Sequence, residues 1–145
     1  MIQVFKTALL PYPVHDVYQT VLEVESYPLF LPWCSETLVH KQTEVLQEAT
    51  ITLRKGLFKE SFRTLNHLLP DQRIQMDLVA GPFQFLSGVW EFIALNDSAT
   101  EVRLSIDFEM KRGPFKVMLE SAFHQIAQSL LEAFCKRVRE QSKQP

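Results

Sequence analysis

The amino-acid sequence predicts an α+β helix-grip fold, in which a curved antiparallel sheet of about seven strands grips a long C-terminal helix. Three observations predict it: an apolar stripe at helical spacing near the end of the chain, period-two alternation through its middle, and short turn signals between the alternating runs. The expected order is one strand, two short helices, about six strands and the long helix. For a chain of 145 residues, we expect a single domain spanning residues 1–145.

Two short helices are predicted after a first strand over residues 2–9. Residues 14–24 place apolar side chains at helical spacing after Pro13, although no Ser, Thr or Asp cap precedes them. Residues 26–32 then form a very short helix or turn, with Pro28 in its first turn and Pro32 ending it.

The middle of the chain, from about Cys34 to Arg112, alternates between apolar and polar residues. The clearest run covers residues 102–110, where every second residue is apolar, as in a strand with one buried and one solvated face. Gly56 and Gly81 fall at turns between such runs, and Gly88, inside a run, predicts a β-bulge.

One long helix is predicted from about Gly113 to Gln141. Gly113 ends the preceding strand, and Pro114 suits a first helical turn, whose N–H groups lack partners within the helix. Such a helix across a strongly curved sheet can leave an apolar cavity, the usual place for a small apolar ligand. Its apolar face comprises Phe115, Met118, Leu119, Ala122, Phe123, Ile126, Ala127, Leu130, Phe134 and Val138.

Composition and charge exclude several classes of function. The net charge of −2 and the pI near 6.1 argue against a general polyanion binder, so we expect no DNA binding. The two cysteines, Cys34 and Cys135, show no motif spacing, which fits a reducing compartment. No apolar run reaches the ~18 residues of a membrane span and no signal-peptide pattern is present, so a cytoplasmic protein is expected.

Patterns typical of catalysis or metal binding are absent from the sequence. His15, His40, His67 and His124 are scattered, without metal-ligand spacing among themselves or with the cysteines. The chain has no glycine-rich phosphate loop, nucleophile elbow or paired-carboxylate motif. We therefore expect no enzyme, no metal site and no resident cofactor.

Two stretches resemble the signature motifs of one family. Residues 26–34, Ser-Tyr-Pro-Leu-Phe-Leu-Pro-Trp-Cys, and residues 81–92, Gly-Pro-Phe-Gln-Phe-Leu-Ser-Gly-Val-Trp-Glu-Phe, are similar to motifs of the coenzyme Q-binding START-domain family. The resemblance covers almost the whole chain. It implies a START-like fold that binds ubiquinone or a similar polyisoprenoid lipid and supports respiratory electron transport. It also implies an alternative, because bacterial members act as toxins that bind the large ribosomal subunit, block subunit joining and inhibit translation.

The candidates for a cavity wall are large apolar side chains of two kinds. Some occupy the alternate strand positions that should face inward, and others lie in the short segment after the first helix. The alternative for each of them is plain core packing. Because each buried CH₂ contributes roughly 0.8 kcal/mol, such a wall would hold a prenylated quinone without a charged anchor. The candidates are Tyr27, Phe30, Leu31, Trp33, Phe62, Met76, Leu78, Phe83, Trp90, Phe92, Leu104, Phe108, Leu119, Phe123 and Ile126.

The segment 27–33 has two interpretations. It is either a hydrophobic lid packed on the sheet edge or a movable gate with Phe30 and Trp33 at the mouth of the cavity. In the second interpretation, Phe83 and Phe85 face the segment from the other motif.

Polar residues on one predicted strand also have two interpretations. Glu60, Thr64 and Asn66 are an even number of residues from Phe62, so all four side chains should lie on the same face of the sheet. If Phe62 points inward, the three polar side chains are buried too and require hydrogen-bond partners. They would then hold a quinone head group or ordered water. The alternative, which we favour from the sequence, is an edge strand with both faces partly wet.

A basic hairpin around Gly56 is the local candidate for an anion contact. A solvated hairpin is the plainer interpretation. The sharper one is a phosphate-contacting patch for ribosomal RNA, or for anionic lipid during transient contact with a membrane surface. The hairpin residues are Arg54, Lys55, Lys59 and Arg63, with Lys111 and Arg112 as further candidates.

Overall fold

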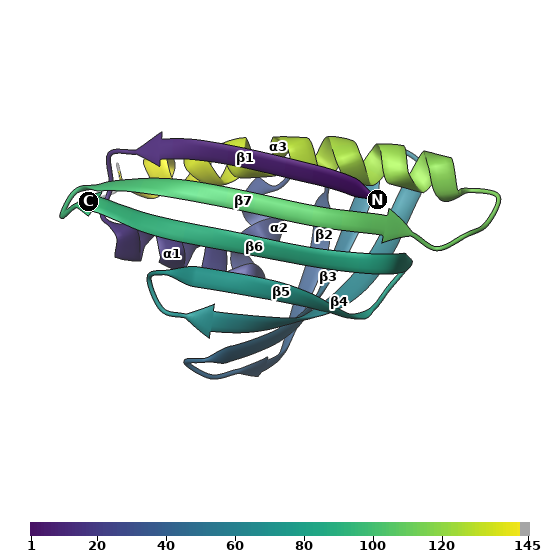
Figure 1. Ribbon diagram of the computed structural model, residues 1–145, viewed down its shortest axis with the longest axis horizontal. Helices are drawn as coiled ribbons and strands as arrows, with labels where there is room; N and C mark the ends of the chain where they lie inside the picture. Colours follow the sequence, from purple (N-terminus) through teal and green to yellow (C-terminus); the bar gives the residue numbers. More distant parts are fainter. Residues whose placement is uncertain (143–145) are drawn as a thin grey trace.

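The computed structural model describes residues 1–142, and its elements follow the predicted order (Figure 1). Residues 143–145 of the predicted domain lie outside the described residues. The elements are β1 (Ile2–Leu10), α1 (Val14–Leu22), the 3₁₀ turn η1 (Val24–Ser26), α2 (Tyr27–Phe30), β2 (Cys34–Gln42), β3 (Leu46–Lys55), β4 (Phe58–Leu69), β5 (Arg73–Ala80), β6 (Phe83–Asn96), β7 (Ala99–Met110) and α3 (Lys116–Ser142).

The strands form one seven-stranded antiparallel sheet in the order β1-β7-β6-β5-β4-β3-β2. Strands β2 to β7 pair with their neighbours along the chain, whereas β1 pairs with the last strand, β7. Figure 1 shows α3 running alongside β1, with β2 to β4 curving away behind it. This arrangement confirms the α+β fold in which a curved sheet grips the C-terminal helix.

Burial confirms the period-two alternation in β7. The apolar residues of the run 102–110 are all at most 4% exposed, and α3 packs against this strand. Full burial of a large apolar side chain contributes roughly 1.5–3 kcal/mol, so this interface is the main core. The buried stripe of α3 comprises Phe123, Ile126, Ala127, Leu131, Phe134, Cys135 and Val138.

The predicted apolar face of the long helix is wrong at its beginning. Phe115, just before the helix, is 63% exposed, and Met118 in the first turn is 47% exposed. Figure 1 shows this turn lying beyond the ends of β6 and β7. The periodicity of the helix does not report how far the sheet extends, so the sequence pattern continues past the covered surface.

The N-terminal helices are short, and no side-chain hydrogen bond caps α1, as the sequence predicts. The Pro13 carbonyl instead accepts hydrogen bonds from the N–H groups of Asp16 and Val17, at 3.1 and 3.3 Å. Pro28 stands in the first turn of α2, also as predicted. Within residues 1–142, none of the helices combines the length and the apolar character that crossing a membrane requires.

Gly88 is not at a bulge, and that prediction is wrong. The β6–β7 register runs unbroken through Gly88, which pairs with Ile106, and the irregularities fall nearer the two ends of β6. On its other side Gly88 pairs with Met76 of β5, and a Cβ atom at position 88 would overlap the Met76 methyl group. The glycine therefore makes room for a neighbouring side chain.

Gly81, in the turn before β6, is the glycine whose replacement should cost most. Its φ is +153°, and a Cβ atom there would lie 2.7 Å from Phe62 Cβ. We expect Gly81→Ala to lower the free energy of unfolding by about 1–3 kcal/mol, measured by chemical denaturation. Gly113→Ala is the control, because nothing lies within 4 Å of its Cβ position. Equal effects of the two changes would contradict this account.

Candidate functional site

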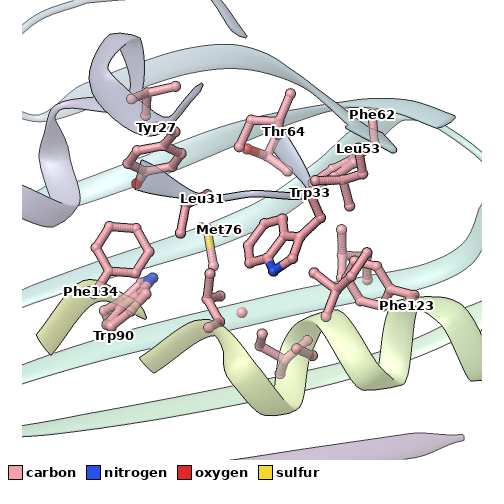
Figure 2. A pocket seen from close by; sticks show the side chains of 18 of the residues that line it. Tyr27, Leu31, Trp33, Leu53, Phe62, Thr64, Met76, Trp90, Phe123 and Phe134 are labelled. Atoms are coloured by element: carbon pink, nitrogen blue, oxygen red, sulfur yellow. The ribbon is translucent and has the colours of Figure 1, made fainter. Parts of the chain in front are cut away.

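A cavity lies between α3 and the concave face of the sheet, and α2 with the residues that follow it lies over one side (Figure 2). The volume that the centre of a water-sized sphere can occupy in it is about 80 Å³. The wall is mostly apolar, and its polar side-chain atoms belong to Thr64 and Asn66 of β4, to Tyr27 and to the indoles of Trp33 and Trp90. Its residues are Val24, Tyr27, Leu31, Trp33, Ile51, Leu53, Phe62, Thr64, Asn66, Met76, Leu86, Gly88, Trp90, Ile106, Phe123, Ile126, Ala127, Leu130 and Phe134.

Aromatic side chains of α3 fix the helix to the sheet at two points along the cavity. Phe123 packs edge-on against Phe83 and Phe108, with ring centroids 4.9 and 4.6 Å apart. Phe134 packs in the same way on Trp90, at 5.1 Å. The two phenylalanines are about 16 Å apart along the helix axis. Figure 2 shows them at opposite sides of the pocket, with the Trp33 indole between them.

Eight of the fifteen predicted ligand-binding residues line this cavity and seven do not. Parity assigns a residue to a face of the sheet but not to a position along the strand, and the cavity occupies only part of that face. The eight wall residues are Tyr27, Leu31, Trp33, Phe62, Met76, Trp90, Phe123 and Ile126. The seven outside the wall are Phe30, Leu78, Phe83, Phe92, Leu104, Phe108 and Leu119.

Most of the seven residues outside the wall have a clear place in the packing. Phe83 and Phe108 form the aromatic cluster with Phe123 that closes one end of the cavity. Phe92 stacks on the Trp90 ring, with centroids 6.2 Å apart. Leu104 is completely buried. Leu78 and Leu119 are half-buried beside the core.

The wall also includes residues that were not among the sequence candidates, above all Phe134. Its ring contacts those of Tyr27 and Phe30, with centroids 5.1 and 5.2 Å away. Phe134 belongs to the predicted apolar face of the long helix, so the helical periodicity already indicates that it is buried against the sheet. Only the three-dimensional arrangement shows that this ring holds α2 in place.

Phe83 and Phe85 do not face the segment 27–33. Phe85 is 41% exposed, and Phe83 packs in the cluster at the other end of the cavity. Within the segment, the Tyr27 hydroxyl donates to the Val21 carbonyl, and burial raises the pKa of this phenol well above its usual value. Tyr27 is therefore a fixed, neutral part of the wall.

Trp33 separates the cavity from the protein surface. Its side chain is half-buried and lines both the cavity and an outer groove between α2 and the C-terminal half of α3. The Trp33 carbonyl accepts a hydrogen bond from the Arg54 N–H at 2.7 Å, which ties this segment to β3. The outer groove includes Leu29, Phe30 and Arg137, whose guanidinium lies 5.2 Å from the Phe30 ring centroid.

Strand β4 is not an edge strand, so the interpretation favoured from the sequence is wrong. It lies between β3 and β5, and Thr64 and Asn66 are buried on its concave face. Thr64 Oγ1 donates to Asn66 Oδ1 at 2.9 Å, and Asn66 Nδ2 donates to Gln47 Oε1 at 2.9 Å. Glu60, the third residue of this set, does not line the cavity.

The basic hairpin is divided between the two faces of the sheet. Arg54 and Lys59 are exposed and stand directly opposite each other on β3 and β4. Lys55 is next to Arg54 on β3 and therefore points to the opposite face of the sheet, where its Nζ donates to Gln125 Oε1 of α3 at 2.7 Å. Arg63 forms an ion pair with Glu48. Arg54 and Lys59 are thus the hairpin cations without such a contact within residues 1–142.

The thiols are buried and poorly suited to nucleophilic chemistry. Burial raises the pKa of Cys34 to about 11 and also raises the pKa of Cys135. Within the part of the chain that the structure describes, no three His, Cys, Asp or Glu side chains are placed to share a metal ion.

Comparison with known proteins gives the family. Residues 10–135 match the family described as polyketide cyclase / dehydrase and lipid transport. The chain belongs to this family. The ribosome association toxin RatA of Pseudomonas aeruginosa is 39% identical, over 93% of this chain and 94% of that protein. The mitochondrial coenzyme Q-binding protein COQ10 of Dictyostelium discoideum is 25% identical, over 92% of this chain and 67% of that protein.

Solved structures agree with this family assignment. The Zhui aromatase/cyclase from Streptomyces matches with a TM-score of 0.85 at 16% identity, over 98% of this chain and 96% of that one. A START superfamily protein from Mycobacterium smegmatis matches with a TM-score of 0.75 at 18% identity, over 95% and 97%. At these identities the likeness shows the fold alone, and it confirms the START-like fold expected from the sequence motifs.

The buried thiols should be unreactive in the folded protein. The thiolate is the reacting species, so at about pH 8 we expect iodoacetamide to label Cys34 and Cys135 slowly, and both quickly after unfolding in guanidinium. As the pH approaches about 11, the labelling of Cys34 should accelerate. Mass spectrometry of the Cys135→Ser variant isolates the rate for Cys34. Fast labelling of the native protein at about pH 8 would contradict this account.

Proposed function

We propose that this protein binds ubiquinone or a similar polyisoprenoid lipid in the cavity, without catalysing a reaction, and supports respiratory electron transport. The observation that carries the proposal is the apolar cavity between α3 and the sheet, with its mouth at Trp33. The lipid-transport description of the family and the relationship to a coenzyme Q-binding protein support it. We expect the protein to act in the cytoplasm, as a single domain.

The chemistry of the wall favours a neutral, mostly hydrocarbon ligand. Among residues 1–142, no Asp, Glu, Lys or Arg belongs to the cavity wall, and a buried unpaired charge would be strongly unfavourable there. Each CH₂ group moved from water into such a wall contributes roughly 0.8 kcal/mol, so a few isoprene units suffice for binding. Aromatase/cyclase structures share the fold but, at 16% identity, lend no support to an activity in this chain.

A charge placed in the cavity should abolish lipid retention. Phe123→Glu would bury a carboxylate in the wall, so we expect the purified variant to lose the lipid that co-purifies with the wild type. The measurement is organic extraction followed by mass spectrometry. Phe85→Glu is the matched control, because Phe85 is exposed and lies outside the wall.

A second variant keeps this test decisive if Phe123→Glu does not fold. Leu130 is half-buried in the wall, and Leu130→Trp would fill part of the cavity without adding a charge. Retention should fall in Leu130→Trp and persist in Phe85→Glu. Unchanged lipid content in a folded cavity variant, or an empty wild-type protein, would overturn the proposal.

A second candidate function is ribosome association, as a factor that binds the large ribosomal subunit and blocks subunit joining, which would inhibit translation. The relative that is 39% identical is named a ribosome association toxin, and that name favours this role. Arg54 and Lys59 are the side chains that we assign to a phosphate contact. They are exposed, adjacent and without an acidic partner within residues 1–142.

Charge reversal at Arg54 and Lys59 separates this candidate from lipid binding. In the double variant Arg54→Glu/Lys59→Glu we expect weaker co-sedimentation with large ribosomal subunits. The slope of log affinity against log salt should fall by about one for each lost phosphate contact. Lys41→Glu/Arg73→Glu is the control with the same change in charge at exposed sites outside the hairpin. Equal binding by the two variants would exclude the hairpin as the contact.

A further inference from the structure

A buried chain of three hydrogen-bonded polar side chains reaches the cavity. Thr64 and Asn66 belong to the wall, and Gln47 on β3 lies directly opposite Asn66 in the β3–β4 register. Gln47, Thr64 and Asn66 are 2%, 3% and 5% exposed. Polar side chains buried to this extent in an apolar site are unfavourable unless their hydrogen-bonding groups are satisfied.

A backbone carbonyl fixes the orientation of the whole chain. Gln47 Nε2 donates to the Leu22 carbonyl at 2.9 Å, and a backbone carbonyl can only accept. The Gln47 oxygen must therefore face Asn66, and Asn66 must present its amide nitrogen to that oxygen. The Asn66 oxygen then accepts the Thr64 proton. Neither side-chain amide can be reversed without losing these bonds.

This orientation leaves one donor of the chain unused. Asn66 Nδ2 carries two protons, and only its bond to Gln47 is found within residues 1–142. The Thr64 proton is already given to Asn66, so the threonine offers only acceptor capacity. The second Asn66 N–H is thus a neutral, fixed donor in a wall whose other residues are mostly apolar.

We propose that Asn66 is the polar anchor of the cavity and selects neutral apolar ligands whose head carries a hydrogen-bond acceptor, such as a quinone carbonyl. The proposal rests on ligand binding in this cavity. The head group enters first and accepts a hydrogen bond from the free Asn66 N–H. Gln47 and Thr64 act as positioning residues that orient the Asn66 amide. The hydrocarbon chain leaves past Trp33, the wall residue shared with the outer groove.

The test compares two ligands with the same alkyl chain, decylubiquinone and decylbenzene, which lacks the carbonyl acceptors. Each displaces a fluorescent apolar probe from the full-length protein. We expect the wild type to prefer the quinone by about tenfold, the effect of one buried hydrogen bond. Asn66→Leu should abolish this preference and leave decylbenzene affinity within about twofold.

Two further variants keep the result interpretable. Asn66→Ser retains one hydroxyl proton for Gln47 and has none for the ligand, so it should also lose the preference even if Asn66→Leu fails to fold. Thr52→Val is the matched control, because Thr52 is a buried, hydrogen-bonded residue of β3 that lies outside the cavity wall. It should keep the quinone preference within about twofold of wild type.

The outcomes separate the anchor from the proposed function. If neither ligand displaces the probe from the wild type, lipid binding in the cavity fails and the anchor fails with it. If both ligands bind and the Asn66 variants keep the wild-type preference, the anchor is wrong while lipid binding stands. Loss of the preference in Thr52→Val to the same extent as in Asn66→Ser would also overturn the assignment to Asn66.

Discussion

The structure depends on how α3 is held above the sheet. Phe123 and Phe134 contact the aromatic residues of β6 and β7 at two points about 16 Å apart along the helix. The wall residues of α3 between these points are aliphatic and smaller. Two rings therefore set the spacing between helix and sheet, and the aliphatic side chains between them do not fill it. The cavity follows from this difference in size.

The sequence predicts the architecture well because periodicity is a local property. Alternation in 102–110 and the helical stripe around Phe123 each record which face is buried, and the order of elements then leaves one way to cover the sheet. Gly88 shows the limit of this reasoning. A glycine within a strand signals a close approach, but the sequence does not identify Met76 as the neighbour that needs the space.

The candidate site was only partly predictable, because a wall is defined by position along each strand as well as by face. Leu104 and Trp90 are paired across β6 and β7 on the same face, yet only Trp90 reaches the cavity. The polar residues of β4 show a related limit of sequence-based prediction. Their hydrogen-bond partner Gln47 lies on another strand, so a buried and satisfied Asn66 could not be distinguished from an exposed one.

The two candidate functions use opposite faces of the same two strands. Side chains alternate along β3, so Leu53 lines the cavity while Arg54 is exposed on the convex face. Phe62 and Lys59 are divided in the same way on β4. A ligand in the cavity would therefore lie on the opposite side of these strands from Arg54 and Lys59. Substitutions on the concave face can therefore test lipid binding without altering Arg54 or Lys59, and substitutions at these two cations can test the phosphate contact without altering the cavity wall.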